Sequence, residues 1–387
     1  MGTDVTPLNV ALIGTGFMGR AHSNAWMSVN KFFDVPRHVV MHTVCGSDLA
    51  QAEAFAERWG WQHATADVGA VAADGEIDLV DVTTPNDLHR AHATAALAAG
   101  KHVACEKPLA GTRQDARAMR DAARAARSGG ASAWVWFNYR RCPAVAYARQ
   151  LVLDGRLGRL YHVRAQYLQD WGGPQTPMSW RFDNTRAGSG AHGDLNAHII
   201  DMAGFVTGDD ITEITGGLEA RFIERREMPG GDTQMSSVDD CVMFLARFSS
   251  GAVGSFEASR LATGNLNRNR LEINGELGAL RFDFERMNEL EWFDNTVDPG
   301  RRGWTTIMCT TAVVHPYIDA YWPPGHGIGF EHQFISQAAD MIREISGGSP
   351  AVPLPDFDDA YRTQCVLEAA IVSARQRRSV PLADIID

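Results

Sequence analysis

Short apolar runs alternate with amphipathic stretches through the first third of the chain. The run 8–13 is almost continuously apolar, as expected for a strand buried on both faces of a parallel sheet. Strand and helix patterns then alternate up to about residue 139, which is typical of βαβ units. The expected strands are 8–13, 39–45, 79–83, 102–105 and 133–139, and the expected helices are 20–27, 50–59, 89–99 and 112–127. The pattern predicts an α/β fold that begins with a parallel sheet.

After residue 139 the expected strands follow one another without helices between most of them. They are 160–168, 213–221, 241–248, 252–258, 270–273 and 279–284, several joined by short turns. Helices are expected at 331–345 and 358–376, and the Trp-, Pro- and Gly-rich stretch 293–326 is expected to form long loops. We therefore predict two domains. Residues 1–134 would form a Rossmann domain, and residues 135–387 an α+β domain with a large, mostly antiparallel open sheet.

Composition and charge narrow the classes of partner. The 387-residue chain has a formal net charge of −11, which argues against a nucleic acid or an anionic membrane surface as partner. No run approaches the roughly 18 apolar residues of a membrane span, and the polar lead 1–7 does not resemble a signal peptide. The six cysteines are scattered without disulfide or metal-ligand spacing, which favours a reducing cytoplasm.

A glycine-rich segment, Gly14-Thr15-Gly16-Phe17-Met18-Gly19, lies where the first strand meets the first helix. In this context Gly14 permits a tight turn, Gly16 lets the backbone approach a pyrophosphate, and Gly19 lets helix and strand pack closely. The helix N-terminus offers free N–H groups to phosphates. The segment, including Phe17 and Met18, is therefore predicted to bind a dinucleotide, although a tight turn without a ligand is the alternative reading of this motif.

The end of the second strand bears on the choice of dinucleotide. Gly46 stands where an acidic residue normally contacts the ribose of NAD, and Ser47 and Asp48 follow it. Asp48 could still reach the ribose and would repel a 2′-phosphate, and no basic residue lies between 45 and 57. The sequence favours NAD and leaves NADP open.

Three further motifs accompany the glycine-rich segment. They are Thr83-Thr84-Pro85-Asn86 with His89, then Glu106-Lys107-Pro108, and then the segment 188–198, which contains Asp194 and His198. Together and in this order they resemble the GFO/IDH/MocA (glucose–fructose oxidoreductase/inositol dehydrogenase) family over nearly the whole chain. Within it, the segments 138–141, 169–171 and 179–182 are similar to those of levoglucosan-oxidising members. The resemblance implies that Ser47, Asp48, Thr83, Thr84, Pro85, Asn86, His89, Glu106 and Lys107 bind the cofactor.

Lys107, Asp194 and His198 are the candidate catalytic residues. Because Asp194 and His198 are four residues apart, a helix would place them on one face, where the aspartate could hydrogen-bond the imidazole and leave its other nitrogen to take a proton. By resemblance, Lys107 would bond the reacting oxygen and stabilise alkoxide charge. No metal site is predicted, although the spacing of His192, Asp194 and His198 is compatible with one.

Aromatic rings and an arginine guanidinium in the second half of the chain are the candidate sugar-binding groups. Trp322 and His326 lie in the expected loop region and are candidates to cover the site or that of a neighbouring subunit. The residues predicted to bind substrate are Lys107, Tyr139, Gln169, Trp171, Arg181, Asp194 and His198.

The resulting hypothesis is an NAD(P)-dependent dehydrogenase that oxidises a secondary ring hydroxyl of a sugar, anhydrosugar, glycoside or inositol. One alternative is an NADPH-dependent keto-sugar reductase, which the Gly46-Ser47 pair keeps open. Another is a non-catalytic dinucleotide-binding sensor or co-repressor, which would be expected to lack Lys107 or the Asp/His pair. The resemblance implies a homodimer or homotetramer with a small-molecule partner.

Overall fold

The computed structural model describes residues 6–386, and its first half is a six-stranded parallel sheet in the order β3-β2-β1-β4-β5-β6. Because right-handed crossovers leave β1 and β4 in opposite directions, α1 and α4 cover opposite faces of this sheet. The strands are β1 (Pro7–Ile13), β2 (His38–Cys45), β3 (His63–Thr65), β4 (Leu79–Val82), β5 (His102–Cys105) and β6 (Ala133–Val135). The helices are α1 (Phe17–Phe32), α2 (Leu49–Trp59), α3 (Val68–Ala73), α4 (Asn86–Ala98) and α5 (Arg113–Arg127).

The second half is a nine-stranded sheet in the order β16-β15-β14-β13-β7-β12-β11-β8-β17, with a separate β9–β10 hairpin. Only the β7–β12 pair in this sheet is parallel among the described residues. The strands are β7 (Leu160–Leu168), β8 (Ile211–Ala220), β9 (Arg225–Glu227), β10 (Thr233–Met235), β11 (Cys241–Phe248), β12 (Val253–Ser259), β13 (Arg268–Gly275), β14 (Gly278–Asp283), β15 (Glu289–Asp294), β16 (Trp304–Met308) and β17 (Val380–Pro381). The expected fold class, an α/β protein with a mostly antiparallel second sheet, is confirmed.

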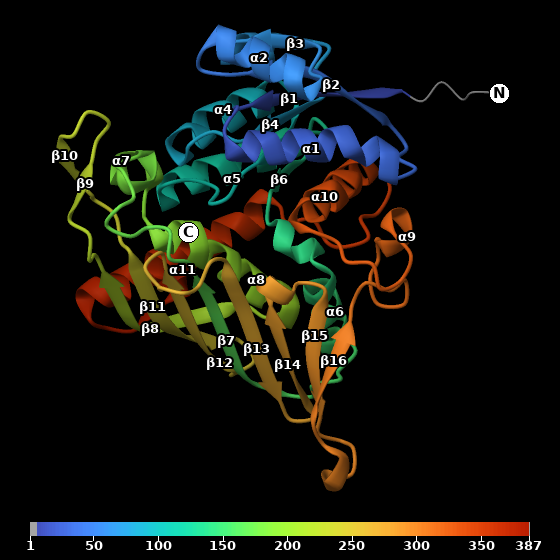
Figure 1. The fold of residues 1–387 in the computed structure, drawn as a ribbon, viewed down its shortest axis with the longest axis vertical. Helices are drawn as coiled ribbons and strands as arrows, with labels where there is room; N and C mark the ends of the chain where they lie inside the picture. The colour runs from blue at the N-terminus through green and yellow to red at the C-terminus, as the bar shows by residue number, and fades with distance from the viewer. Residues whose placement is uncertain (1–5, 387) are drawn as a thin grey trace.

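One face of the second sheet packs on helices and the other is open (Figure 1). The helices are α6 (Pro143–Leu153), α7 (Asn184–Ala187), α8 (Ala197–Thr207), α9 (Ile318–Tyr321), α10 (Phe330–Ile345) and α11 (Phe357–Gln376). Of these, α6, α8 and α11 pack on the sheet. Helix α10 packs on α1, and α11 also packs on α5, so the end of the chain returns to the first sheet.

Several sequence predictions need correction. The stretch 293–326 is not only loop, because it contains the end of β15, all of β16 and α9. Its strands were missed because β16 is an edge strand whose side chains are largely exposed, so no apolar alternation marks it. Helix α1 is longer than the expected 20–27, and strand β6 ends at Val135 instead of residue 139. The segments that were not predicted are β3, β9, β10, β17, α3, α6, α7 and α8.

Two predictions stay as they were made. The boundary between domains 1–134 and 135–387 remains a prediction. The prediction that the polar lead 1–7 does not resemble a signal peptide concerns residues 1–5 in particular, and these lie outside the described residues. Among residues 6–386, no helix combines the length and the apolar character that crossing a membrane requires.

Candidate active site

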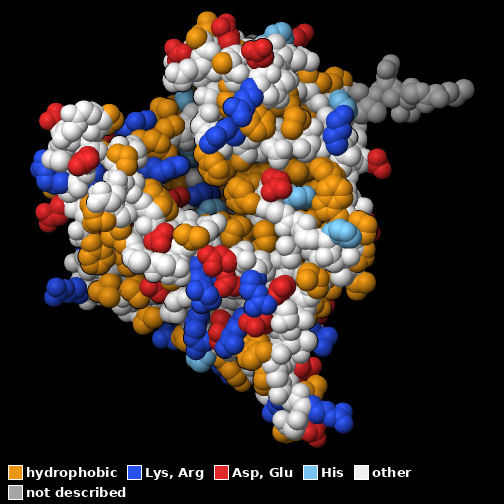
Figure 2. Space-filling view, in the orientation of Figure 1, with side chains coloured by type: hydrophobic (Ala, Val, Ile, Leu, Met, Phe, Trp, Pro, Cys, Tyr) orange, Lys and Arg blue, Asp and Glu red, His pale blue; other side chains and the backbone are white. Residues whose placement is uncertain are grey.

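A cavity of about 870 Å³ lies between the two sheets, at the carboxyl ends of β1, β4 and β5. This is the edge at which open α/β sheets bind ligands. Figure 2 shows the hollow between the two halves of the molecule. Nearly all the residues that the sequence predicted for the site line it. They are Gly14, Gly16, Phe17, Met18, Ser47, Thr83, Thr84, Pro85, Asn86, His89, Glu106, Lys107, Tyr139, Gln169, Trp171, Arg181, Asp194 and His198.

The glycine-rich turn forms one end of the cavity. Gly14 has a φ of +114°, and a Cβ there would lie 2.6 Å from Thr83 Oγ1, so only glycine fits without strain. A Cβ at Gly16 would meet no atom within 4 Å, yet Gly16 lines the cavity. Packing within the protein therefore does not require glycine at 16. The open space in front of its backbone fits a group that must come close, such as a phosphate at the N-terminus of α1.

Gly19 and Asp48 do not line the cavity. A Cβ at Gly19 would lie 2.2 Å from the Gly14 carbonyl oxygen, so Gly19 acts through the close packing of α1 on the turn. The Asp48 carboxylate accepts a hydrogen bond from the Gln51 backbone N–H and caps α2. Ser47 and Gly46 face the cavity in its place.

His89 joins two loops of the cofactor side. Its Nε2 lies 2.9 Å from the Thr84 carbonyl oxygen, and its Nδ1 lies 3.1 Å from that of Pro108. The ring is buried, and this burial lowers the pKa of His89. Both partners are acceptors and a neutral imidazole donates through one nitrogen only, so His89 hydrogen-bonds one of the β4–α4 and β5–α5 loops and packs closely on the other. Asn86 donates to the Ala187 carbonyl oxygen at 2.9 Å and so links α4 to the second half of the chain.

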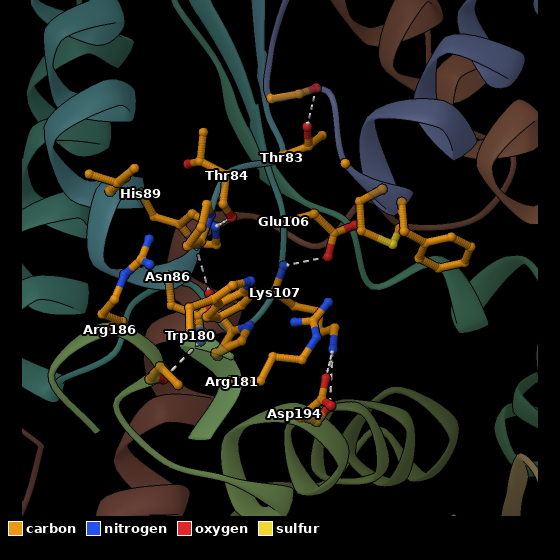
Figure 3. A pocket seen from close by; sticks show the side chains of 18 of the residues that line it. Thr83, Thr84, Asn86, His89, Glu106, Lys107, Trp180, Arg181, Arg186 and Asp194 are labelled. Atoms are coloured by element: carbon orange, nitrogen blue, oxygen red, sulfur yellow. Dashed lines mark hydrogen bonds and ion pairs between the residues drawn. The ribbon is translucent and has the colours of Figure 1, made fainter. Parts of the chain in front are cut away.

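Lys107 and Asp194 meet in the cavity from opposite halves of the chain (Figure 3). Lys107 Nζ donates to Asp194 Oδ1 at 2.8 Å and to the Asp194 carbonyl oxygen at 3.0 Å. The second carboxylate oxygen accepts a hydrogen bond from Arg260 at 2.9 Å. Burial alone would raise the pKa of Asp194, but Lys107 and Arg260 hold the pKa well below its usual range. Asp194 is therefore an ionised carboxylate shared by two cations.

The expected hydrogen bond between Asp194 and His198 is not formed among the described residues, and the Asp194 carboxylate oxygens bond instead to Lys107 and Arg260. The backbone contributes as well, since residues 192–196 form a π-helical turn before α8 and so change the helical phase between the two side chains. His198 Nδ1 is buried without a hydrogen-bond partner among the described residues. Burial and the nearby Lys107 ammonium hold the pKa of His198 well below its usual range. The imidazole is therefore neutral near pH 7, with one unprotonated ring nitrogen.

Aromatic and amide side chains from the second half form the far wall of the cavity. The Tyr139 ring lies 4.6 Å from the His198 ring, and its hydroxyl shares a hydrogen bond with Tyr167. Trp171 donates to Gln169 at 2.6 Å, and the Arg181 guanidinium stacks on Trp180 at 4.4 Å. This wall combines apolar ring faces with donors and acceptors.

Several residues that the sequence suggested lie elsewhere. The His192 ring is buried, with Nε2 2.8 Å from the Leu367 carbonyl oxygen and Nδ1 2.9 Å from the Asn196 amide, so it does not join Asp194 and His198. Trp322 packs on Phe32, and neither it nor His326 lines the cavity, so they do not cover the site within this chain.

Other residues of the site were missed. Arg260 and Asn267 line the cavity, and His22 hydrogen-bonds Glu106 from behind it. A signal was available for Arg260, since it is a basic residue two positions after the end of the expected strand 252–258. His22 had no comparable signal, because it reads as one position of an amphipathic helix.

Comparison with known proteins agrees with this geometry. Residues 8–129 match a family described as an oxidoreductase family with an NAD-binding Rossmann fold, and residues 145–281 match the GFO/IDH/MocA C-terminal domain. Levoglucosan dehydrogenase of Pseudarthrobacter phenanthrenivorans is 39% identical over 98% of this chain and 99% of that protein.

Solved structures are similar over the full length. An oxidoreductase domain protein from Kribbella flavida superimposes with a TM-score of 0.94 at 46% identity, covering 99% of this chain and all of that one. A levoglucosan dehydrogenase in complex with NADH and levoglucosan superimposes with a TM-score of 0.91 at 39% identity, covering 97% of this chain and 100% of that one. The resemblance drawn from the sequence motifs is confirmed, and the chain belongs to the GFO/IDH/MocA family of NAD-dependent oxidoreductases.

Proposed function

We propose that this protein is an NAD-dependent dehydrogenase that oxidises a secondary ring hydroxyl of a sugar, anhydrosugar, glycoside or inositol. The observation that carries the proposal is the convergence of Lys107, Asp194 and His198 on the cavity that the glycine-rich turn opens. The levoglucosan dehydrogenase complexes with NADH and levoglucosan support this substrate class, because those proteins align with this chain over nearly its whole length.

The described residues fit a dinucleotide. The backbone at Gly14 and Gly16 and the N-terminus of α1 would hold the pyrophosphate, while Ser47 lies at the end of β2, where the ribose of NAD binds in this fold. The other predicted cofactor contacts, from the turn 83–86 to Glu106, line the same cavity as Ser47 and Lys107. When bound, NAD supplies the hydride acceptor.

The protein supplies the proton chemistry. Two hydrogens of Lys107 Nζ are directed to Asp194, which leaves the third to donate to the substrate oxygen. The substrate hydroxyl proton passes to the neutral imidazole of His198, and the Lys107 ammonium stabilises the negative charge that develops on the oxygen. Asp194 holds the ammonium in place. Tyr139, Gln169, Trp171 and Arg181 would bind the ring and its remaining hydroxyls.

Replacement of Lys107 by alanine tests the proposal. Turnover should fall by about 10³-fold or more, because one group supplies both orientation and charge stabilisation. The affinity for NADH, measured by fluorescence titration, should change by less than about threefold. The assay follows nicotinamide reduction with NAD and with NADP, using levoglucosan, inositols, glucose, xylose and simple glucosides.

Lys31, an exposed lysine on α1, provides the matched control, and Lys31→Ala should behave as wild type. An active Lys107→Ala enzyme would exclude the assigned role. A wild-type protein that binds NADH but turns over none of these compounds would favour the sensor.

We further propose that the protein is a cytoplasmic homodimer or homotetramer. Five of the cysteines, Cys45, Cys105, Cys142, Cys241 and Cys309, are free thiols, which suits a reducing compartment. The open face of the second sheet carries exposed apolar side chains on β8, β11 and β12, namely Leu218, Met243, Leu245 and Val253. A contiguous apolar face of this kind marks a protein interface.

A further inference from the structure

Arg260 is buried beneath the active site, with only 2% of its surface exposed. It follows β12 directly, and its Nη2 donates to Asp194 Oδ2 at 2.9 Å. Lys107 Nζ donates to the other oxygen, Oδ1, at 2.8 Å. Each oxygen of the Asp194 carboxylate is thus held by a different cation, and the three groups together carry one net positive charge.

The same guanidinium supports the substrate wall. Its Nη1 donates to the Arg181 carbonyl oxygen at 3.3 Å, and its Cζ lies 5.0 Å from the centre of the Trp171 ring. The Gly172 N–H donates to the Arg260 carbonyl oxygen at 3.0 Å, and a Cβ at Gly172 would lie 2.9 Å from Arg260 Cβ. The loop that carries Trp171 and Arg181 is therefore packed on Arg260.

We propose that Arg260 is a positioning residue that fixes the Asp194 carboxylate against Lys107 and links it to the loop 169–182 that binds the substrate. The inference rests on the proposed function and deepens it. Arg260 holds the Asp194 carboxylate away from His198, whose Nδ1 has no hydrogen-bond partner among the described residues. Arg260 also leaves the site with excess positive charge, which stabilises an oxygen that becomes negative in the transition state.

Arg226 provides a comparison, because it supports the same loop but does not contact Asp194. It is buried as well, and it donates to the carbonyl oxygens of Gly172 at 2.8 Å and Gly173 at 3.0 Å. Its guanidinium stacks on Phe182 at 3.7 Å, and its carboxylate partner is Asp240 instead of Asp194. Arg226 therefore holds the same loop without contacting the catalytic carboxylate.

The test compares Arg260→Ala with Arg226→Ala in the holoenzyme. In Arg260→Ala, kcat should fall by about 100-fold or more, whereas Arg226→Ala should raise KM and keep kcat within about threefold. Added guanidinium ion should restore part of the kcat of Arg260→Ala and none of that of Lys107→Ala. Equal losses of kcat in both arginine variants, without rescue by guanidinium, would show that Arg260 only supports the loop and would overturn the inference.

Two further measurements keep the inference testable. If Arg260→Ala does not fold, Arg260→Lys and Arg260→Gln replace it. The lysine variant should retain at least about tenfold more kcat than the glutamine variant, because only lysine preserves the charge beside Asp194, and equal values would overturn the inference.

If the wild type oxidises no sugar, the proposed function fails, and a crystal structure of the Arg260→Ala or Arg260→Gln variant then decides on Arg260. The Asp194 carboxylate should leave its position against Lys107, and an unchanged contact would contradict the inference.

Discussion

The His22 imidazole lies buried behind the active site with a carboxylate on each ring nitrogen. Its Nδ1 is 2.9 Å from Asp81 Oδ2, and its Nε2 is 3.0 Å from Glu106 Oε1. Burial alone lowers the pKa of His22, but Asp81 and Glu106 outweigh it and raise the pKa to about 9. The other Glu106 oxygen accepts the backbone N–H of Lys107 at 3.0 Å. A protonated His22 therefore neutralises one of two buried carboxylates and fixes the turn that carries Lys107.

This pairing predicts a pH dependence of stability. Because the folded-state pKa of His22 lies above its unfolded value of 6.5, its contribution is complete below pH 6.5 and is lost as pH rises through about 9. The loss should be on the order of 3 kcal/mol. Denaturant unfolding from pH 6 to 10 should show this decline in wild type relative to His22→Asn. Parallel curves for the two proteins would contradict the assignment, and His38→Gln, at the exposed first residue of β2, serves as control.

At the scale of elements, the apolar periodicity of the sequence predicted the central strands of the sheets well, but it missed exposed edge strands and fully buried helices. Strands β7 and β11 match their expected ranges because each shows apolar alternation or a continuous run over eight or nine residues. The β15–β16 hairpin was missed because β16 buries too few side chains to leave a pattern. Helix α8 was missed because it is buried nearly all round, so it lacks an amphipathic period.

The loop after α7 meets the loop after β5 at two glycines, close to Lys107 and Asp194. Gly188 has a φ of +78°, and a Cβ there would lie 2.1 Å from the Gly111 carbonyl oxygen. Gly347 has a similar φ of +80° with open space around it. Gly347→Ala should therefore cost about 1 kcal/mol of unfolding free energy, and Gly188→Ala clearly more, because backbone must also move. If denaturant unfolding gives the same loss of unfolding free energy for both variants, the close contact between Gly188 and Gly111 does not constrain position 188.

At the scale of the whole molecule, the open sheet face divides into two surfaces. Hydrophobic side chains gather over β8 and β11, while Arg and Asp/Glu side chains alternate over β13 and β14 (Figure 2). The charged surface pairs within the chain, since Arg281 bonds Glu272 and Arg270 bonds Asp283. The apolar surface has no such partner among the described residues, which makes it the part that a second copy would cover.

Leu218 and Leu245, 65% and 52% exposed, lie on adjacent strands of this apolar surface. The double replacement Leu218→Glu/Leu245→Glu should weaken self-association by at least about tenfold, because it would bury charge in the contact. Sedimentation velocity measures the change. Val313→Glu, at a loop position 93% exposed, should keep the wild-type mass. If the double variant assembles as wild type does, the contact lies on another surface.

The sequence by itself determined the main strands of both sheets, the family and most of the predicted site residues that line the cavity, because apolar periodicity and short motifs are local properties. Only the tertiary structure decided the partners of the charged groups. Lys107 and Asp194 are 87 positions apart, and His22 and Asp81 are 59 apart, so packing alone brings them together. The expected bond from Asp194 to His198 was wrong for the same reason: Arg260, 66 positions further along the chain, takes one oxygen of that carboxylate, and Lys107 takes the other.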